Sequence, residues 1–344
     1  MIRSLALLCL LWLAGGVPAA GAQGRIVTAT LPSQALLGNR IGDSVDRPIT
    51  VYLPPSYDQA PSRRYPVLYL LHGATSVPVE WLDGTYQGMD LRAALDQQAA
   101  QGEFLVVMPM ADNRFGGSFY VDSPAFGHWD AFVARELVDF IDRRFRTLPL
   151  RRYRGLAGHS MGGFGALSVA GRHPGVFGHV YAASPCCLAL VGDLARDGER
   201  WQRPLGGWLR AMAMAFDPDP RGAGEDAAPP LPFAPGADGS MHAVPTVMAR
   251  WQRELPLARL ARDPAPYRQL CSLALDAGRQ DQIPSVPLGA AAFAAALTRA
   301  GVPHAFTLYD GDHVDHVRDR FEQHLLPFFA QAFARAGTRR DRCR

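Results

Sequence analysis

The chain has 344 residues, of which 48% are hydrophobic and 19% are charged, with 34 glycines and 28 prolines. This composition excludes a disordered or fibrous protein and fits a globular protein of enzyme size. All 35 basic residues are arginine, which excludes mechanisms that need a lysine. Because the 32 acidic residues are interspersed among the arginines, no basic stripe indicates nucleic-acid binding.

The first 22 residues have the pattern of a secretory signal peptide. Arg3 precedes an apolar run from Leu5 to Leu13, and small residues end the segment at Ala20-Gly21-Ala22. The run is shorter than the roughly 20 apolar residues that a transmembrane helix needs. We therefore expect a secreted or periplasmic mature chain that begins near Gln23 and has no stable membrane anchor; a retained anchor is the alternative.

Short apolar or β-branched runs alternate with longer helical patterns along residues 23–344. This alternation predicts one α/β domain with a mainly parallel sheet flanked by helices. Several runs are continuously apolar, as is typical of strands buried on both faces. We expect strands at 49–53, 67–72, 104–109, 153–158, 178–184, 270–276 and 305–309, and helices at 90–101, 129–145, 162–173, 288–300 and 314–334.

A segment from about 188 to 265 interrupts the alternation. Its middle, 217–239, is rich in proline, glycine, alanine and aspartate, while tryptophan and methionine residues flank it. A long segment without periodicity inside a compact domain is typical of a lid, a binding loop or a disordered insert. Because it follows an expected parallel strand, it leaves the sheet at the edge where such sheets bind ligands. We expect helical flanks and a lid-like insert over the active-site mouth.

The sequence Gly158-His159-Ser160-Met161-Gly162 lies between an expected strand and an expected helix. A G-x-S-x-G pattern in this context is typical of the strand–turn–helix elbow that exposes a nucleophilic serine above the sheet. The alternative is a glycine-rich turn in which the serine only caps a helix. The context favours Ser160 as a nucleophile.

A nucleophilic serine needs a histidine base that takes its proton and an acid that orients the histidine. In chains with such an elbow, the acid follows the serine in the sequence and the histidine follows the acid. The loop after strand 270–276 offers Asp276 and Asp281, and the loop after strand 305–309 offers His313 and His316. His313 directly follows the Gly311 turn and is the expected base, with His316 as a competitor. Asp281, in the loop, is favoured over Asp276, whose direction is set by the strand pleat.

The reaction also needs amide donors for the oxyanion. The usual pair is the residue after the nucleophile and a residue in the loop after an early strand. Here these are Met161 and Ala74, the latter in the sequence His72-Gly73-Ala74-Thr75. An ordinary strand-ending turn is the alternative at His72-Gly73.

Several of these motifs together resemble the esterase D and mycolyltransferase superfamily of α/β hydrolases, in its secreted, tributyrin-esterase-like branch. The segments that carry the resemblance are Leu53–Tyr57, Tyr65–Gly73, Met108-Pro109, Gly117–Pro124 and, most specifically, Gly155–Ala166. The resemblance extends from about Ile49 to Phe329, apart from the insert.

The resemblance implies an α/β-hydrolase fold, small-molecule ester substrates, no cofactor and no metal. By motif position it places the nucleophile at Ser160, the acid at Asp281 and the base at His313. It implies a serine carboxylesterase that forms an acyl-enzyme, with a short or aromatic acyl group. An acyltransferase of the mycolyltransferase type with the same triad, and a catalytically dead binding protein on this scaffold, are the alternatives.

Two further groups of residues have open roles. Trp81, Phe119 and Tyr120 either line an acyl pocket or belong to the core. Cys186, Cys187, Cys271 and Cys343 are either buried thiols or disulfide partners. A bridge from Cys271 to Cys186 or Cys187 is not expected, because opposite ends of neighbouring strands lie roughly 20 Å apart.

Overall fold

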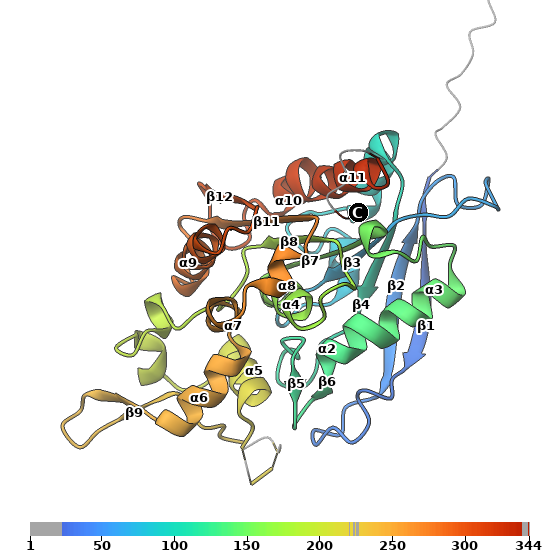
Figure 1. Ribbon diagram of the computed structural model, residues 1–344. Coiled ribbons are helices and arrows are strands. Elements are labelled where there is room, and N and C mark those ends of the chain that lie inside the picture. Colours follow the sequence, from blue (N-terminus) through green and yellow to red (C-terminus); the bar gives the residue numbers. More distant parts are fainter. Residues whose placement is uncertain (1–22, 220, 223, 225–226, 339–342, 344) are drawn as a thin grey trace, which may run out of the picture.

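The computed structural model describes residues 23–219, 221, 222, 224, 227–338 and 343, so the expected signal peptide at 1–22 lies outside the described residues. The central element is an eight-stranded sheet in the order β1-β2-β4-β3-β7-β8-β11-β12 (Figure 1). Its strands are β1 (Arg25–Pro32), β2 (Asp46–Leu53), β3 (Val67–Leu71), β4 (Leu105–Pro109), β7 (Arg154–His159), β8 (His179–Ala183), β11 (Ser272–Gly278) and β12 (Ala305–Tyr309).

The sheet is mainly parallel, which confirms the predicted fold class. Only the β1–β2 and β2–β4 pairs are antiparallel within this sheet, and the other neighbouring strands run parallel. Each of the seven expected strands overlaps an observed one. The sequence does not predict β1, because this edge strand has one buried hydrophobic residue, Leu31.

Helices cover both faces of the sheet, and the pleat divides the core between them. Leu68 and Leu70 of β3 pack with α1 (Leu91–Gln98), α10 (Val317–Arg320) and α11 (Leu326–Arg335). Tyr69 and Leu71 belong to the core of the opposite face. That face carries α2 (Trp129–Ala131), α3 (Val138–Arg144), α4 (Met161–Arg172) and α9 (Ser285–Arg299). Short π-helical turns join α2 to α3 and α10 to α11.

The segment 188–265 folds beside the sheet domain rather than within it (Figure 1). It contains α5 (Gly207–Phe216), α6 (Pro245–Glu254), α7 (Pro256–Arg262) and the hairpin of β9 (Phe233–Pro235) and β10 (Met241–Ala243), and α8 (Ala265–Arg268) follows it. Phe216 of α5 packs against Phe119, Phe164 and Trp251. The expected helical flanks are therefore present and share the core of the α4 face, while the lid role remains a prediction.

The remaining short pair, β5 (Asp122–Ser123) with β6 (Gly127–His128), lies beside α2. Trp81, Phe119 and Tyr120 are fully buried, so they belong to the core.

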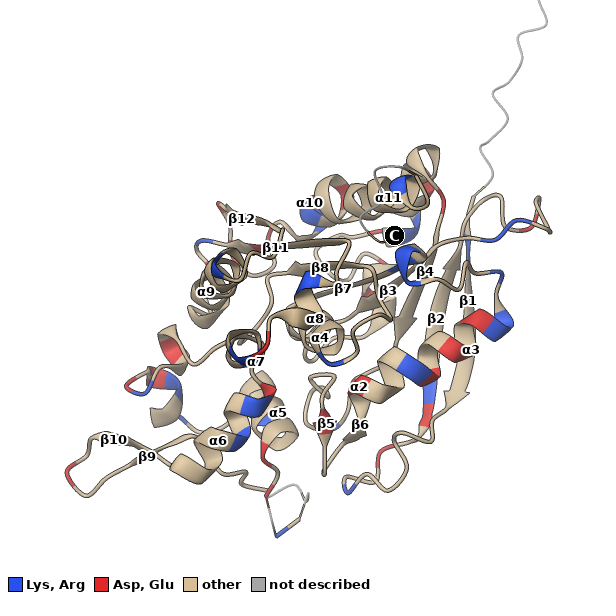
Figure 2. Ribbon diagram, in the orientation of Figure 1, with Lys and Arg blue, Asp and Glu red and all other residues tan. Residues whose placement is uncertain are grey.

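Charged residues of both signs are interspersed over helices and loops (Figure 2). None of the helices in the described part of the chain is long and apolar enough to cross a membrane.

The cysteines pair in two disulfides, Cys186–Cys187 and Cys271–Cys343. Cys271 therefore bonds neither Cys186 nor Cys187, as the strand geometry predicts. Cys271 immediately precedes β11. Its bridge therefore joins Cys343 to the start of the strand next to the edge strand β12.

Candidate active site

Ser160 lies in the turn between β7 and α4. Its backbone dihedrals are φ 56° and ψ −116°, a conformation that costs a non-glycine residue about 1–3 kcal/mol. Hydrogen bonds hold the turn: the Ser160 amide donates to Ala183 O at 3.0 Å, and Ser160 O accepts from Phe164 N and Cys186 N, both at 3.0 Å. The predicted nucleophile therefore sits in the strained elbow that its motif predicts.

Gly158 and Gly162 make this elbow sterically possible. A Cβ on Gly158 would overlap the backbone of Gly162, and a Cβ on Gly162 would overlap the carbonyl group of Leu71. The close approach of β3, β7 and α4 thus requires both glycines of the motif. The reason is close approach, because neither residue has a positive φ.

Ser160, His313 and Asp281 are brought together at the carboxyl edge of the sheet, after β7, β12 and β11 respectively. The Ser160 Oγ lies 2.9 Å from His313 Nε2, and His313 Nδ1 lies 2.6 Å from Asp281 Oδ2. Because a carboxylate only accepts, Nδ1 carries the proton and Nε2 faces the serine as an acceptor. Asp281 Oδ1 accepts from Ile283 N at 2.8 Å, which fixes the carboxylate. Both side chains of the His–Asp pair are buried.

The competing acid, Asp276, points to the opposite face of the sheet. Its carboxylate accepts from Tyr181 Oη at 2.6 Å and from Arg320 Nη2 at 2.7 Å. The strand continues to Gly278, so Asp276 does not end it, contrary to the sequence prediction. As predicted, the pleat sets its direction, and the side chain joins the core that contains Ala274 rather than the triad.

The competing base, His316, lies outside the triad. Its side chain is 45% exposed, with Nε2 3.8 Å from Asp315 and Nδ1 3.6 Å from Asp319. The expected helix begins at Val317, later than predicted, so His316 precedes it instead of lying in its first turn. His316 therefore shares no helix face with His313.

Gly278 lets two loops of the site meet. Its φ is not positive, so its backbone conformation does not require glycine. A Cβ at this position would overlap the carbonyl oxygens of Gly311 and Asp312. The missing side chain lets the acid loop and the histidine loop meet, and Gln280 N donates to Gly311 O at 3.0 Å across that contact.

The two predicted oxyanion donors lie at the elbow. Met161 is the first residue of α4, so its amide has no intrahelical acceptor. Ala74 follows Gly73, whose Cβ position would be 3.5 Å from the Ser160 Cβ. Within the described part of the chain, neither amide donates a hydrogen bond. Thr75 N donates to Gly116 O at 2.8 Å and fixes the loop that carries Ala74.

His72 anchors this loop, a role that the sequence analysis did not assign. It is fully buried, and burial lowers its pKa to about 4. Its neutral ring donates from Nδ1 to Gly73 O at 2.8 Å and accepts at Nε2 from Ala111 N at 2.8 Å. His72 therefore ties the oxyanion loop to the segment that follows β4.

His159, the variable residue before Ser160 in the G-x-S-x-G motif, forms a hydrogen bond with the backbone of the predicted base His313. Burial and the neighbouring His313 lower its pKa to about 3, so its ring is neutral. Nε2 donates to the carbonyl oxygen of His313 at 2.9 Å, which leaves Nδ1 to accept from Tyr86 Oη at 3.0 Å. The two hydrogen bonds that link Tyr86 to His159 and His159 to His313 hold the backbone of the predicted base in place. The sequence did not predict this role, because the bond joins positions 154 residues apart.

The described residues contain no group of three or more His, Cys, Asp or Glu side chains arranged to hold a metal ion. The elbow itself brings together a serine, a histidine hydrogen-bonded to it and two backbone amides. Sheet order, strained serine and hydrogen-bonded triad together define the α/β-hydrolase class. The chain belongs to the family described as "Putative esterase", whose model matches residues 42–332.

Curated relatives match part of the chain. Esterase Rv1288 of Mycobacterium tuberculosis is 33% identical over 139 residues, which cover 40% of this chain and 28% of that protein. S-formylglutathione hydrolase of Paracoccus denitrificans is 31% identical over 166 residues, which cover 42% of this chain and 54% of that protein. The chain therefore spans about a quarter to a half of the length of these relatives.

Solved structures match nearly the whole fold. A ferulic acid esterase superposes with a TM-score of 0.64 at 24% identity, over 90% of this chain and 99% of the other. S-formylglutathione hydrolase from Agrobacterium tumefaciens gives a TM-score of 0.61 at 20% identity, over 91% and 96% of the two chains. At these identities the similarity shows a shared fold.

Proposed function

We propose that this chain is a serine carboxylesterase that hydrolyses small esters through an acyl-enzyme on Ser160. The observation that carries the proposal is the continuous hydrogen-bonded path from Asp281 through His313 to Ser160 at the strained elbow. Membership of the esterase family and the names of the relatives support the same reaction class. A short or aromatic acyl group is the substrate class that these names favour.

Each residue of the path has a defined task in this proposal. His313 Nε2 takes the Ser160 proton as Oγ attacks the ester carbonyl carbon, and Asp281 stabilises the resulting imidazolium. The Ala74 and Met161 amides donate to the oxyanion that forms on the carbonyl oxygen. His313 then gives the proton to the departing alcohol, and a water molecule activated by the same histidine releases the acid and restores Ser160.

The test is turnover of p-nitrophenyl acetate and butyrate, combined with labelling by a fluorophosphonate. We expect Ser160→Ala and His313→Ala each to lower kcat by several orders of magnitude, with the label confined to Ser160 in the wild type. His316→Ala is the matched control, because that histidine lies in the same loop but outside the triad, and it should keep most activity.

Two results would contradict the proposal in different ways. A folded wild-type protein with neither turnover nor label would be a binding protein on a hydrolase scaffold. Transfer of the acyl group to an added alcohol in strong preference to water would make the chain an acyltransferase with the same acyl-enzyme.

A further inference from the structure

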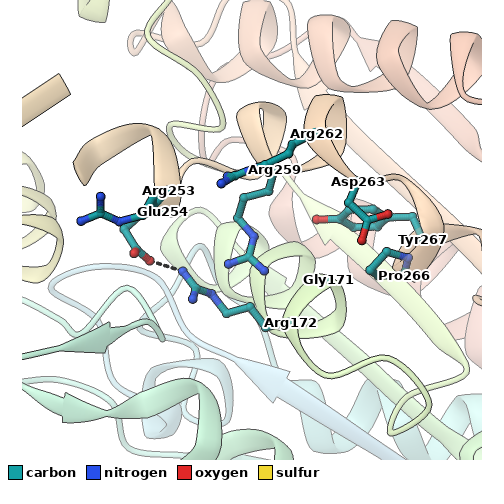
Figure 3. A pocket seen from close by; sticks show the side chains of 9 residues that line it. All are labelled: Gly171, Arg172, Arg253, Glu254, Arg259, Arg262, Asp263, Pro266 and Tyr267. Atoms are coloured by element: carbon teal, nitrogen blue, oxygen red, sulfur yellow. Dashed lines mark hydrogen bonds and ion pairs between the residues drawn. The ribbon is translucent and has the colours of Figure 1, made fainter. Parts of the chain in front are cut away.

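A cavity of about 420 Å³ lies at the end of α4 that is remote from Ser160. Its wall is formed by Arg172 at the end of α4, by Arg253 and Glu254 at the end of α6, and by Arg259, Arg262 and Asp263 on and after α7 (Figure 3). Since α4 has 12 residues, the cavity is roughly 18 Å from the elbow along the helix axis. It is therefore separate from the proposed catalytic residues.

The two carboxylates of this cavity already have partners. Glu254 accepts a hydrogen bond from Arg172 (Figure 3), and Asp263 Oδ1 accepts from Ala265 N at 2.9 Å at the start of α8. Outside the lining, Asp130 Oδ2 lies 3.8 Å from Arg172 Nε. That distance is beyond hydrogen-bond range, and Arg172 Nε is a buried N–H group without a hydrogen-bond partner.

Among the described residues, Arg253, Arg259 and Arg262 have no hydrogen-bond or ion-pair partner, and Arg259 is the most buried of these three arginines. It is partly buried, and its side chain makes no hydrogen bond or ion pair to any residue in the described part of the chain. Its guanidinium extends toward that of Arg172 (Figure 3). Burial, and next the Arg172 charge, lower the pKa of Arg259. Glu254 and Tyr267 offset only part of this effect, so the partly buried positive charges of Arg172 and Arg259 favour an anion beside them.

We propose that this cavity binds a small dianionic ligand, either a phosphate group or a pair of carboxylates, through Arg172, Arg259 and Arg262. Four arginines and two carboxylates line the cavity, and Asp130 lies behind Arg172, so the cavity has an excess of positive charge that an anionic ligand would balance. Planar guanidinium groups donate two parallel hydrogen bonds to such oxyanions. Because all basic residues of the chain are arginine, the presence of arginine rather than lysine here is not itself a sign of oxyanion binding. The site does not depend on the proposed ester hydrolysis.

The test is calorimetric titration with inorganic phosphate and with succinate, against sodium chloride at equal ionic strength. We expect the wild type to bind at least one of the two anions, and Arg259→Gln to bind it at least about tenfold more weakly. Arg299→Gln is the matched control. Arg299 lies in the last turn of α9, as Arg259 lies in the last turn of α7, but Arg299 is exposed and does not line the cavity. This control should bind like the wild type.

Melting temperatures without added anion give a second readout. Arg259→Gln should melt at the same temperature as the wild type or higher, because it removes an uncompensated charge. The proposal is overturned if the wild type binds neither anion at millimolar concentration, or if Arg259→Gln binds as tightly as the wild type. A lower melting temperature of Arg259→Gln would instead assign Arg259 a structural role. Because ester turnover is not measured, none of these results bears on the proposed hydrolase activity.

Discussion

Asp276 and Asp281 are five positions apart, yet asparagine at each should damage a different property of the protein. The Asp276 side chain is 1% exposed and pairs with Arg320, which is 11% exposed. Asp276→Asn keeps the shape but leaves the Arg320 charge buried without its counterion, which costs about 3–5 kcal/mol of stability. For a chain of this size, roughly 2 °C is lost per kcal/mol, so the melting temperature should fall by about 6–10 °C.

Asp281→Asn should have the reverse profile. The carboxylate holds the His313 Nδ1 proton across 2.6 Å, and an amide cannot stabilise the imidazolium in the same way. We expect kcat to fall roughly 10³–10⁴-fold, as when the acid of a serine triad is removed. The melting temperature should change less than in Asp276→Asn, because among the described residues Asp281 pairs with His313 and the Ile283 amide and not with an arginine.

The assay is kcat for p-nitrophenyl butyrate per mole of folded protein, with folding followed by circular dichroism at a temperature below both transitions. Both substitutions are isosteric, so each serves as the control for the other. The reasoning would be refuted if folded Asp276→Asn lost more activity than Asp281→Asn. Equal losses of stability in the two variants would also refute it, since only one of them removes the counterion of a buried arginine.

Four further outcomes are expected. His159→Leu should lower kcat about 10- to 100-fold with little change in KM, and Tyr86→Phe less, because the carbonyl of the base loses its donor; unchanged kinetics would remove the positioning role. The free energy of unfolding should decline as the pH falls from about 6.5 towards 4, because His72, with a folded pKa of about 4, binds a proton only in the unfolded chain; His72→Gln should flatten that slope in a melting series. Trimming Asp217–Gly239 should change KM or ester preference while the fold survives, and identical kinetics across ester sizes would make the insert a bystander. Mass spectrometry of protein from the native host should find an N-terminus near Gln23, whereas an intact Met1 would refute export.

The parts of the fold that the sequence predicts are those with strong local signals. Continuous apolar runs such as Val67–Leu71 identify buried parallel strands, because few other elements are short and apolar throughout. The edge strand β1 escaped this rule, since most of its residues are exposed or half-buried. The helical flanks of the insert were predicted from tryptophan and methionine residues, but its hairpin β9–β10 has no comparable pattern.

The candidate site divides along the same line. Ser160 and the order of acid and histidine follow from local motifs. The pleat of β11 directs the Asp276 side chain away from His313. The supporting contacts are long-range: the Arg320–Asp276 pair joins positions 44 residues apart, and the His159–His313 bond joins positions 154 residues apart. No local pattern encodes such pairs, so only the folded arrangement assigns them.

Ser160 and His313 are 153 positions apart, and this separation also matters for how the protein is made. A chain grows from its N-terminus, and its domains begin to fold as they emerge. The elbow and α4 are complete when residue 172 has been added, but the insert, β11 and β12 must still follow before the histidine exists. Every nascent or truncated chain that ends before residue 313 lacks the base of the proposed reaction. Ester turnover would therefore show that synthesis had passed residue 313 and that β11 and β12 had folded into the sheet.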